Sequence, residues 1–455
     1  MALYRSFVLL PLLLLLGTGC SLLQPPPAPS TPTPVPTALP LALQLAANRS
    51  REPVTDPTND LVPAVDPEIV FLVENVSKQS LMGYVQTLES FGTRNTFSET
   101  ELDDFGIGAA RRWIFNEFLR VGNGRLQVEN QEYSFSFLGL TTTQYNIIAT
   151  LPGTGNHPGV LVMMANYDSR ADDWLDGDSL APGADDNGSG VAALLEIARL
   201  MSSRTWNQTI IFAALTAEEQ GTFGSRYFVG DAFLDGLTVH AAINNDMIGG
   251  RTAIPQSVRL FAADLYTSNN GQLARYIDYV GGLYLPTFPV DMIDGLDRVG
   301  RWGDHREFLR AGYPAVRLIE SEEDLSIQNS TRDTWQLIDY DYLRKVVRLN
   351  LVALANMVGA PPASTFPIVA PTSDPGSFLV TWTPAPEAAG YAISVRPLRS
   401  ERFPPFRFVS AAQAGNVILS GFDPQTTYAV SIAALDQRGR LGLFSSPELI
   451  IEPTP

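Results

Sequence analysis

Histidine and cysteine are scarce in this sequence, although they are the side chains that zinc prefers in proteins. The 455 residues include three histidines and one cysteine. A single cysteine excludes an intramolecular disulfide. Positive charge is scarce as well, because 31 lysines and arginines face 48 aspartates and glutamates, which gives a formal net charge of −17. Such a chain would repel a polyanion, so we predict that nucleic acid is not a partner.

The first twenty residues have the pattern of a secretory signal. Arg5 precedes an apolar run that ends at Leu16 and is too short to span a membrane comfortably. Small residues then lead to Cys20, and this arrangement resembles a bacterial lipoprotein signal, although Gly17 stands where that signal favours leucine. The alternative is an ordinary cleaved signal with an unrelated cysteine. We expect lipidation at Cys20 and an extracytoplasmic protein anchored to the cell membrane.

The composition divides the rest of the chain into a tether and two globular parts. Residues 21–65 include a proline-rich stretch that is unsuited to helix or sheet, so we expect an extended tether. In residues 66–359, apolar runs of strand length alternate with helical patterns, which predicts an α/β domain with a mostly parallel central sheet flanked by helices. Residues 361–453 contain short alternating strands, which predicts an all-β sandwich.

The C-terminal part resembles a fibronectin type III domain. Trp382 falls on an early strand, Tyr391 falls on the next, and Tyr428 has the place of the tyrosine that marks the corner of such domains. We interpret Trp382 and Tyr428 as core residues, since no catalytic cluster is visible in this segment. The resemblance implies a spacer, or a domain that binds a protein or carbohydrate partner.

Polar residues follow the apolar strands of the α/β part at several points. They form the clusters ANYDSR, PGADDNGSG, LTAEEQGTFGS and INNDMIGG, followed later by GDHREF and QNSTRDTWQLID. In an α/β sheet, ligands gather at the carboxyl ends of the strands. In this order and spacing, the clusters resemble those of the co-catalytic zinc aminopeptidases, metallopeptidase family twenty-eight, which also includes glutaminyl cyclases and transferrin-receptor-like proteins. The resemblance covers about residues 70–358 and implies a zinc-exopeptidase-like fold.

The resemblance also implies a role for each polar cluster. Glu218 would be the general base, and Asp168 would orient the first metal ligand. Asp186 would bridge two zinc ions. The implied metal ligands are Asn166, Asp186, Glu219, Asp246 and Asn329. The residues implied just outside the ligands are Asp185, Asp304 and His305.

Peptide hydrolysis gives these roles a chemical reason. A bound dication lowers the pKa of a water molecule, which makes that water nucleophilic near neutral pH. A neighbouring carboxylate that is not bound to the metal then takes the proton. Glu218 and Glu219 are adjacent at a strand end and can divide these two tasks.

Two of the implied ligands depart from the family pattern. Asn166 and Asn329 stand where the family has histidine, and His157 and His240 occur in contexts that offer no replacement. An asparagine contributes only a neutral carbonyl oxygen, so the whole set would consist of oxygen donors. Such a set suits calcium, magnesium or manganese better than the zinc that the resemblance implies. The alternative is a site without metal, in which the fold keeps old polar residues at its strand ends.

These features lead to three hypotheses for function. The first is an extracytoplasmic metal-dependent exopeptidase of aminopeptidase type, which acts on peptide or protein substrates and is impaired or uses a different metal because of the two asparagines. The second is a binding protein that keeps the peptidase fold without catalysis. The third is acyl transfer like that of glutaminyl cyclases, and it is disfavoured because it needs the histidine that Asn329 replaces.

Overall fold

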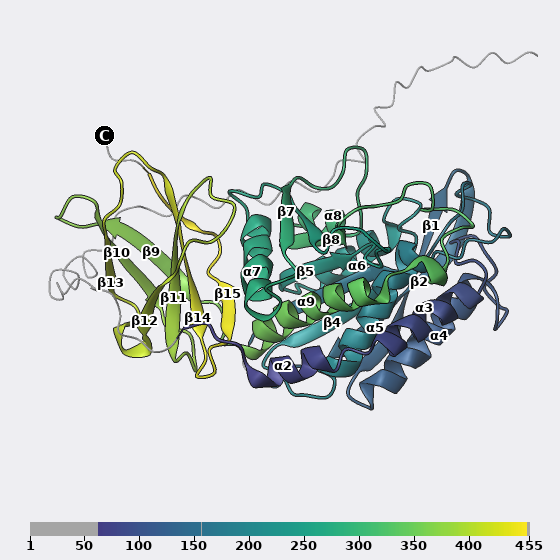
Figure 1. Cartoon of the computed structure of the whole chain (residues 1–455), viewed down its shortest axis with the longest axis horizontal. Helices are drawn as coiled ribbons and strands as arrows, with labels where there is room; N and C mark the ends of the chain where they lie inside the picture. Colours follow the sequence, from purple (N-terminus) through teal and green to yellow (C-terminus); the bar gives the residue numbers. More distant parts are fainter. Residues whose placement is uncertain (1–61, 156, 453–455) are drawn as a thin grey trace, which may run out of the picture. The chain divides into compact units, whose positions relative to one another are not determined.

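Eight strands form the central sheet of the α/β part (Figure 1). The computed structural model describes residues 62–155 and 157–452, so Cys20 and nearly all of the predicted tether lie outside the described residues. The strand order is β1-β2-β4-β3-β5-β8-β6-β7. The strands are β1 (Gln127–Phe137), β2 (Leu140–Leu151), β3 (Val160–Asn166), β4 (Thr209–Leu215), β5 (Val239–Asn245), β6 (Val258–Ala262), β7 (Val290–Asp294) and β8 (Ala315–Glu320).

The strands of this sheet run in both directions. The four central strands β4, β3, β5 and β8 are parallel to one another, and β6 is parallel to β7. The β1–β2, β2–β4 and β6–β8 pairs are antiparallel. The α/β fold that the sequence predicts is therefore confirmed, and the sheet expected to be mostly parallel is a mixed sheet with a parallel centre.

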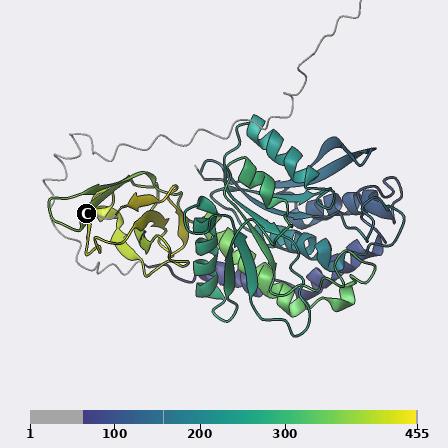
Figure 2. The same cartoon turned by 90° about the horizontal axis from the view of Figure 1, so that it is seen from above.

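Helices lie on both faces of the sheet (Figure 2). This cover explains why every residue of β3 is buried, since a strand covered on both faces needs an uninterrupted apolar run. The longest helix, α9, starts where the Asp339 carboxylate accepts hydrogen bonds from the backbone N–H groups of Asp341 and Tyr342. The helices are α2 (Pro67–Glu74), α3 (Lys78–Ser90), α4 (Gly106–Gly122), α5 (Gly190–Met201), α6 (Phe223–Leu234), α7 (Asn269–Tyr284), α8 (His305–Arg310) and α9 (Tyr340–Gly359).

The parallel centre of the sheet brings four strand ends to one edge. β3, β4, β5 and β8 end at Asn166, Leu215, Asn245 and Glu320. The polar clusters that follow β3, β4 and β5 therefore start side by side. This edge is where the candidate site lies.

Two antiparallel sheets make up the C-terminal part. Trp382 is buried, and its ring packs edge-on against Tyr391 with 5.2 Å between the ring centroids. The Tyr428 hydroxyl accepts a hydrogen bond from the backbone N–H of Asp423 at 3.3 Å, as a corner tyrosine would. These contacts are consistent with the expected fibronectin type III domain, which stays a prediction. The strands are β9 (Thr365–Pro371), β10 (Ser377–Thr383) and β13 (Val417–Ser420) in one sheet, and β11 (Gly390–Pro397), β12 (Arg407–Ser410), β14 (Tyr428–Leu435), β15 (Leu441–Phe444) and β16 (Leu449–Ile451) in the other.

Buried contacts join the C-terminal sheets to the α/β part. Glu448 accepts from Arg275 of α7 at 3.0 Å and from Arg396 of β11 at 2.7 Å, and both arginine side chains are fully buried. Leu441 and Phe444 of β15 belong to the same hydrophobic cluster as residues of α9. A buried carboxylate paired with two guanidiniums is strongly destabilised when one partner is lost, so this contact favours one fixed arrangement.

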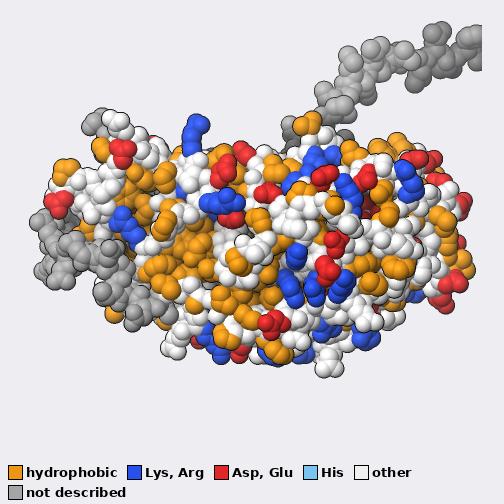
Figure 3. Space-filling view, viewed as in Figure 1, with side chains coloured by type: hydrophobic (Ala, Val, Ile, Leu, Met, Phe, Trp, Pro, Cys, Tyr) orange, Lys and Arg blue, Asp and Glu red, His pale blue; other side chains and the backbone are white. Residues whose placement is uncertain are grey.

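The surface mixes both signs of charge. On the face shown in Figure 3, the lysine and arginine side chains are interspersed with acidic ones. Across residues 62–155 and 157–452, no helix combines the length and the apolar character that crossing a membrane requires.

Candidate active site

The turn after β3 contributes two of the predicted site residues. Asn166 is fully buried, and its side-chain oxygen accepts a hydrogen bond from Asn187 at 2.8 Å. The Asp168 carboxylate accepts hydrogen bonds from the backbone N–H groups of Glu218 at 3.3 Å and Glu219 at 3.1 Å. Asp168 therefore holds the turn that carries the two glutamates, and the Asn166 side-chain amide nitrogen lies 3.4 Å from its backbone oxygen. Burial raises the pKa of Asp168 to about 6, against the lowering effect of these hydrogen bonds.

The turn between β3 and α5 carries Asp185 and Asp186. The carboxylate of Asp333 accepts a hydrogen bond from the backbone N–H of each of them, at 2.9 Å in both cases. The Asp185 carboxylate accepts from the backbone N–H of Gly249 at 2.8 Å, and that of Asp186 accepts from the Gln328 side-chain amide at 2.9 Å. Both aspartates are therefore fixed in place by groups of this chain.

The two glutamates after β4 differ in their surroundings. Glu219 forms a salt bridge with Arg170, with 2.8 Å between Oε2 and Nε. The amide of Asn329, in the orientation that satisfies its neighbours, donates to Glu219 at 3.1 Å and accepts from Arg170 at 3.1 Å. For Glu218, burial, followed by repulsion from Asp246 and Glu219, raises the pKa well above its usual range.

Asp246, directly after β5, is paired with an arginine from the neighbouring strand. Arg317 of β8 forms a salt bridge with the Asp246 carboxylate at 3.0 Å and donates to its backbone oxygen at 2.7 Å. The same guanidinium pairs with Asp297. Burial raises the pKa of Asp246 to about 6, and the nearby Arg317 opposes that rise.

Asp304 and His305 lie at the start of α8 and are both buried. The His305 Nε2 atom is 2.7 Å from the backbone oxygen of Leu296. Burial lowers the pKa of His305 to about 4, so the ring is neutral near pH 7. A neutral ring donates to that oxygen through Nε2–H, and its other nitrogen, Nδ1, has no hydrogen-bond partner among the described residues.

Contacts at this edge of the sheet link Asp168 to Glu218 and Glu219, and Asn329 to Glu219, and they add partners that sequence reasoning missed. Arg317 could have been noticed, because it is a charged residue within the apolar strand AVRLIE. Arg170 stands at the end of the quoted cluster ANYDSR, where nothing in the local pattern indicates its partner. Their pairing with Glu219 and Asp246 depends on the three-dimensional arrangement of strand ends. The partners missed from the sequence are Arg170, Arg317, Gln328 and Asp333.

The donor set found here does not fit zinc. Asn166 and Asn329 supply amide groups in place of imidazole nitrogen, and both amides are used in hydrogen bonds within the site. The carboxylates at the other ligand positions contact Gln328, Arg170 and Arg317. Among the described residues, no group of three or more His, Cys, Asp or Glu side chains has an arrangement that could hold a metal ion. Two of these carboxylates are paired with guanidiniums, Glu219 with Arg170 and Asp246 with Arg317.

Comparison with known proteins assigns the family. A family model described as peptidase family M28 matches residues 146–354. A probable zinc metalloprotease of Leptosphaeria maculans is 34% identical over 337 residues, which covers 66% of this chain and 78% of that protein. Another, from Pyricularia oryzae, is 33% identical over 359 residues and covers 70% of this chain and 72% of that protein. The names of these relatives support a divalent metal, zinc, as the cofactor of such proteins.

Solved structures share the fold. The LapA aminopeptidase of Legionella pneumophila is 20% identical, with a TM-score of 0.53, and the match covers 66% of this chain and 76% of that one. The glutaminyl cyclase of Porphyromonas gingivalis is 22% identical, with a TM-score of 0.50, and the match covers 61% of this chain and 98% of that one. The family model and the relatives indicate a metallopeptidase-like hydrolase, and the chain belongs to peptidase family M28.

Proposed function

We propose that the protein is an extracytoplasmic, exopeptidase-type member of this family that recognises peptide or protein chains while its zinc-dependent hydrolysis is impaired. One observation carries this proposal. The carboxylates of Asp186, Glu219 and Asp246, which would bind the metal ions, are each engaged by a side chain of the protein itself. The family supplies the substrate class, since peptidases act on peptides and proteins.

The chemistry of the arginines supports impaired hydrolysis. A guanidinium neutralises a carboxylate, and it has no open coordination position at which a water could bind and become more acidic. Burial, followed by repulsion from Asp246 and Glu219, raises the pKa of Glu218, which disfavours the ionised form that a general base needs. The guanidiniums of Arg170 and Arg317 occupy carboxylates that a metal ion would need.

Elemental analysis and a hydrolysis assay on the purified full chain test this proposal. We expect substoichiometric metal, peptide binding in calorimetry that a chelator leaves unchanged, and hydrolysis of aminoacyl-nitroanilides no faster than that of Glu218→Gln. The assay includes added zinc, manganese and calcium. Metal-dependent turnover that disappears in Glu218→Gln would contradict the proposal, and so would the absence of any peptide binding.

An exopeptidase that works with a different metal is the second candidate. It is favoured by the closeness of Asp246 and Glu219 to Glu218, and of Asp186 to Glu219, since these carboxylates raise one another's pKa values. An all-oxygen set suits calcium, magnesium or manganese. This candidate predicts that one of these metals restores turnover in the assay above. Glutaminyl-cyclase-like acyl transfer has no comparable support, because an asparagine stands at position 329.

We also propose that Cys20 is lipidated and anchors the protein to the membrane. The support is the signal pattern that ends at this only cysteine of the chain. In a bacterial host, Cys20→Ala is expected to move the protein from the membrane fraction to the soluble fraction and to abolish its labelling by a fatty-acid analogue. A variant that stays in the membrane fraction without the label would contradict this anchor.

A further inference from the structure

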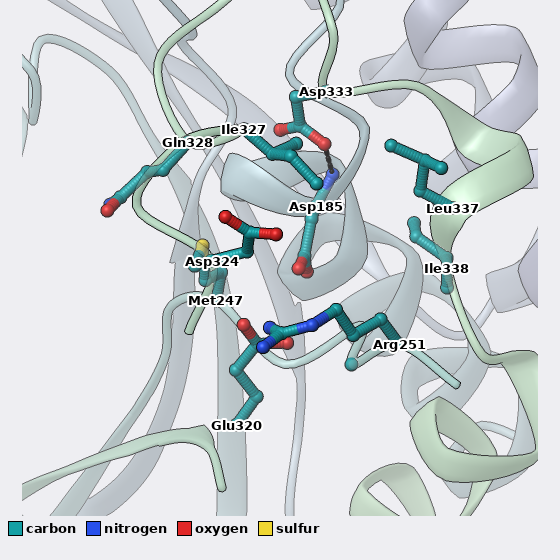
Figure 4. Close-up of a pocket in the computed structure, with 11 residues that line it drawn as sticks. Asp185, Met247, Arg251, Glu320, Asp324, Ile327, Gln328, Asp333, Leu337 and Ile338 are labelled. Carbon is teal, nitrogen blue, oxygen red and sulfur yellow. Dashed lines mark hydrogen bonds between the residues drawn. The ribbon is translucent and has the colours of Figure 1, made fainter. Parts of the chain in front are cut away.

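A small open pocket lies beside the candidate active site (Figure 4). Part of its lining is apolar and consists of Met247, Ile327, Leu337 and Ile338. About 30 Å³ is open to the centre of a water-sized group, which is room for a head group the size of one or two water molecules. The rest of the lining is largely acidic. Its acidic lining residues are Asp185, Glu320, Asp324 and Asp333.

One oxygen of these carboxylates is buried without a partner. Glu320, the last residue of β8, is 2% exposed, and its Oε2 atom has no hydrogen-bond partner among the described residues. In Figure 4 the side chains of Asp185, Asp324 and Glu320 point toward a common space. A buried carboxylate oxygen without a partner is unfavourable, so this oxygen indicates a missing positively charged or hydrogen-bonding group.

The positive charge nearest the pocket is already engaged elsewhere. Arg251 lines the pocket, but its guanidinium donates to the backbone oxygen of Glu322 at 2.9 Å and to its carboxylate at 3.1 Å. Asp333 is used by the backbone N–H groups of Asp185 and Asp186. One guanidinium, that of Arg251, faces four acidic lining residues, so the pocket keeps an excess of negative charge.

Size and chemistry narrow the class of ligand. The described residues contain no carboxylate arrangement suited to a metal ion, and a guanidinium is larger than the space available. A primary ammonium is close to the size of a water molecule, and the apolar wall suits the aliphatic stem that carries it. A lysine side chain has both features. The competing explanation is that Asp185 and Glu320 share a proton and bind nothing.

The pocket adjoins the site where a peptide would lie. Gln328 lines the pocket, and the same side chain donates to Asp186 of the candidate active site. Resting on the proposed function, we infer that this pocket binds the side-chain ammonium of a lysine residue at the end of a bound peptide, with Glu320 as its principal partner. The protein would thus select basic peptide ends.

Calorimetric titration of the full chain with two tripeptides tests this inference. Lys-Ala-Ala and norleucine-Ala-Ala have the same stem and the same α-amine, and they differ in the terminal ammonium. We expect the lysine peptide to bind about 10-fold more tightly, since a charge-assisted hydrogen bond contributes roughly that factor. In Glu320→Gln the ratio should fall to about one. Arg251→Gln removes a competing positive charge and should increase the ratio.

Controls separate this inference from the proposed function. Glu129→Gln removes an exposed charge on β1 and should leave the ratio unchanged, and thermal unfolding checks that each variant is folded. Equal binding of both peptides to the natural protein would overturn the lysine pocket while leaving peptide recognition intact. A preference for lysine that persists in folded Glu320→Gln would also overturn it. Failure of both peptides to bind would overturn the inference and the proposed function together.

Discussion

Replacing Arg317 by methionine is expected to lower the free energy of unfolding by about 3–5 kcal/mol, because breaking a buried ion pair leaves an unpaired buried charge. Arg317 is 2% exposed and pairs with Asp246 and Asp297, both of which are buried at their side chains. Methionine fills a similar length without supplying charge or hydrogen bonds. Urea unfolding near pH 7 measures the effect.

The size of this loss should depend on pH in a defined direction. Without Arg317, burial dominates and raises the folded-state pKa of Asp246 further above its unfolded value of about 3.9. A group with a raised folded pKa loses stability as the pH rises through that pKa, so the loss should be greater at about pH 8 than at about pH 5. Asp297, whose pKa Arg317 and Arg298 lower below its usual range, acts in the same direction.

A surface arginine provides the matched control for this measurement. Arg344 pairs with Asp341 on α9, and both side chains are substantially exposed. Arg344→Met should therefore change the free energy of unfolding by only about 0–1 kcal/mol. A comparably small change in Arg317→Met would mean that the Arg317–Asp246 pair is weak and that Arg317 does not take the place of a metal ion.

Local sequence patterns were sufficient for most of the fold. The run TIIFAAL predicts a buried strand, and β4 has the same bounds, because an uninterrupted apolar run of that length has few other uses in an α/β domain. The run DYLRKVVRLNLVALANMV has apolar residues at three- and four-residue spacing, which predicts a helix at 341–358, and α9 agrees with it to within a residue at each end. The antiparallel pairing of β6 with β8 could not be predicted, since its paired residues are 56 or more positions apart and local patterns do not indicate the direction of a strand.

The candidate site was predicted in its acidic part and missed in its basic part. Strand-end clusters such as ANYDSR indicate that Asp168 and its neighbours meet at one edge, because parallel strands bring their carboxyl ends together. Which arginine pairs with which carboxylate depends on side-chain direction across neighbouring strands. Arg317 reaches Asp246 only because β8 lies beside β5.

The second large effect concerns zinc. Asn329→His alone is expected to bind zinc weakly. A zinc ion bound by this histidine would also need Glu219, and Arg170 still pairs with that carboxylate. The double variant Asn329→His with Arg170→Gln frees Glu219 and removes a positive charge from the place that the ion needs. We expect zinc to bind about 100-fold more tightly to the double variant, since removing a charge at this distance is worth a few kcal/mol. Calorimetry with zinc alone measures the difference.

The single variant Arg170→Gln shows how much of the gain in zinc affinity comes from removing the positive charge and how much comes from the added histidine ligand. It frees Glu219 without adding a nitrogen ligand, and zinc favours imidazole over an amide oxygen, so its zinc affinity should stay well below that of the double variant. If Asn329→His alone bound zinc as tightly as the double variant, the Arg170 pair would be no obstacle to the metal. The missing histidine would then be the sole reason that the carboxylates Asp186 and Glu219 do not hold zinc. The arginine pairs would have followed the loss of the ion and would not be replacements for it.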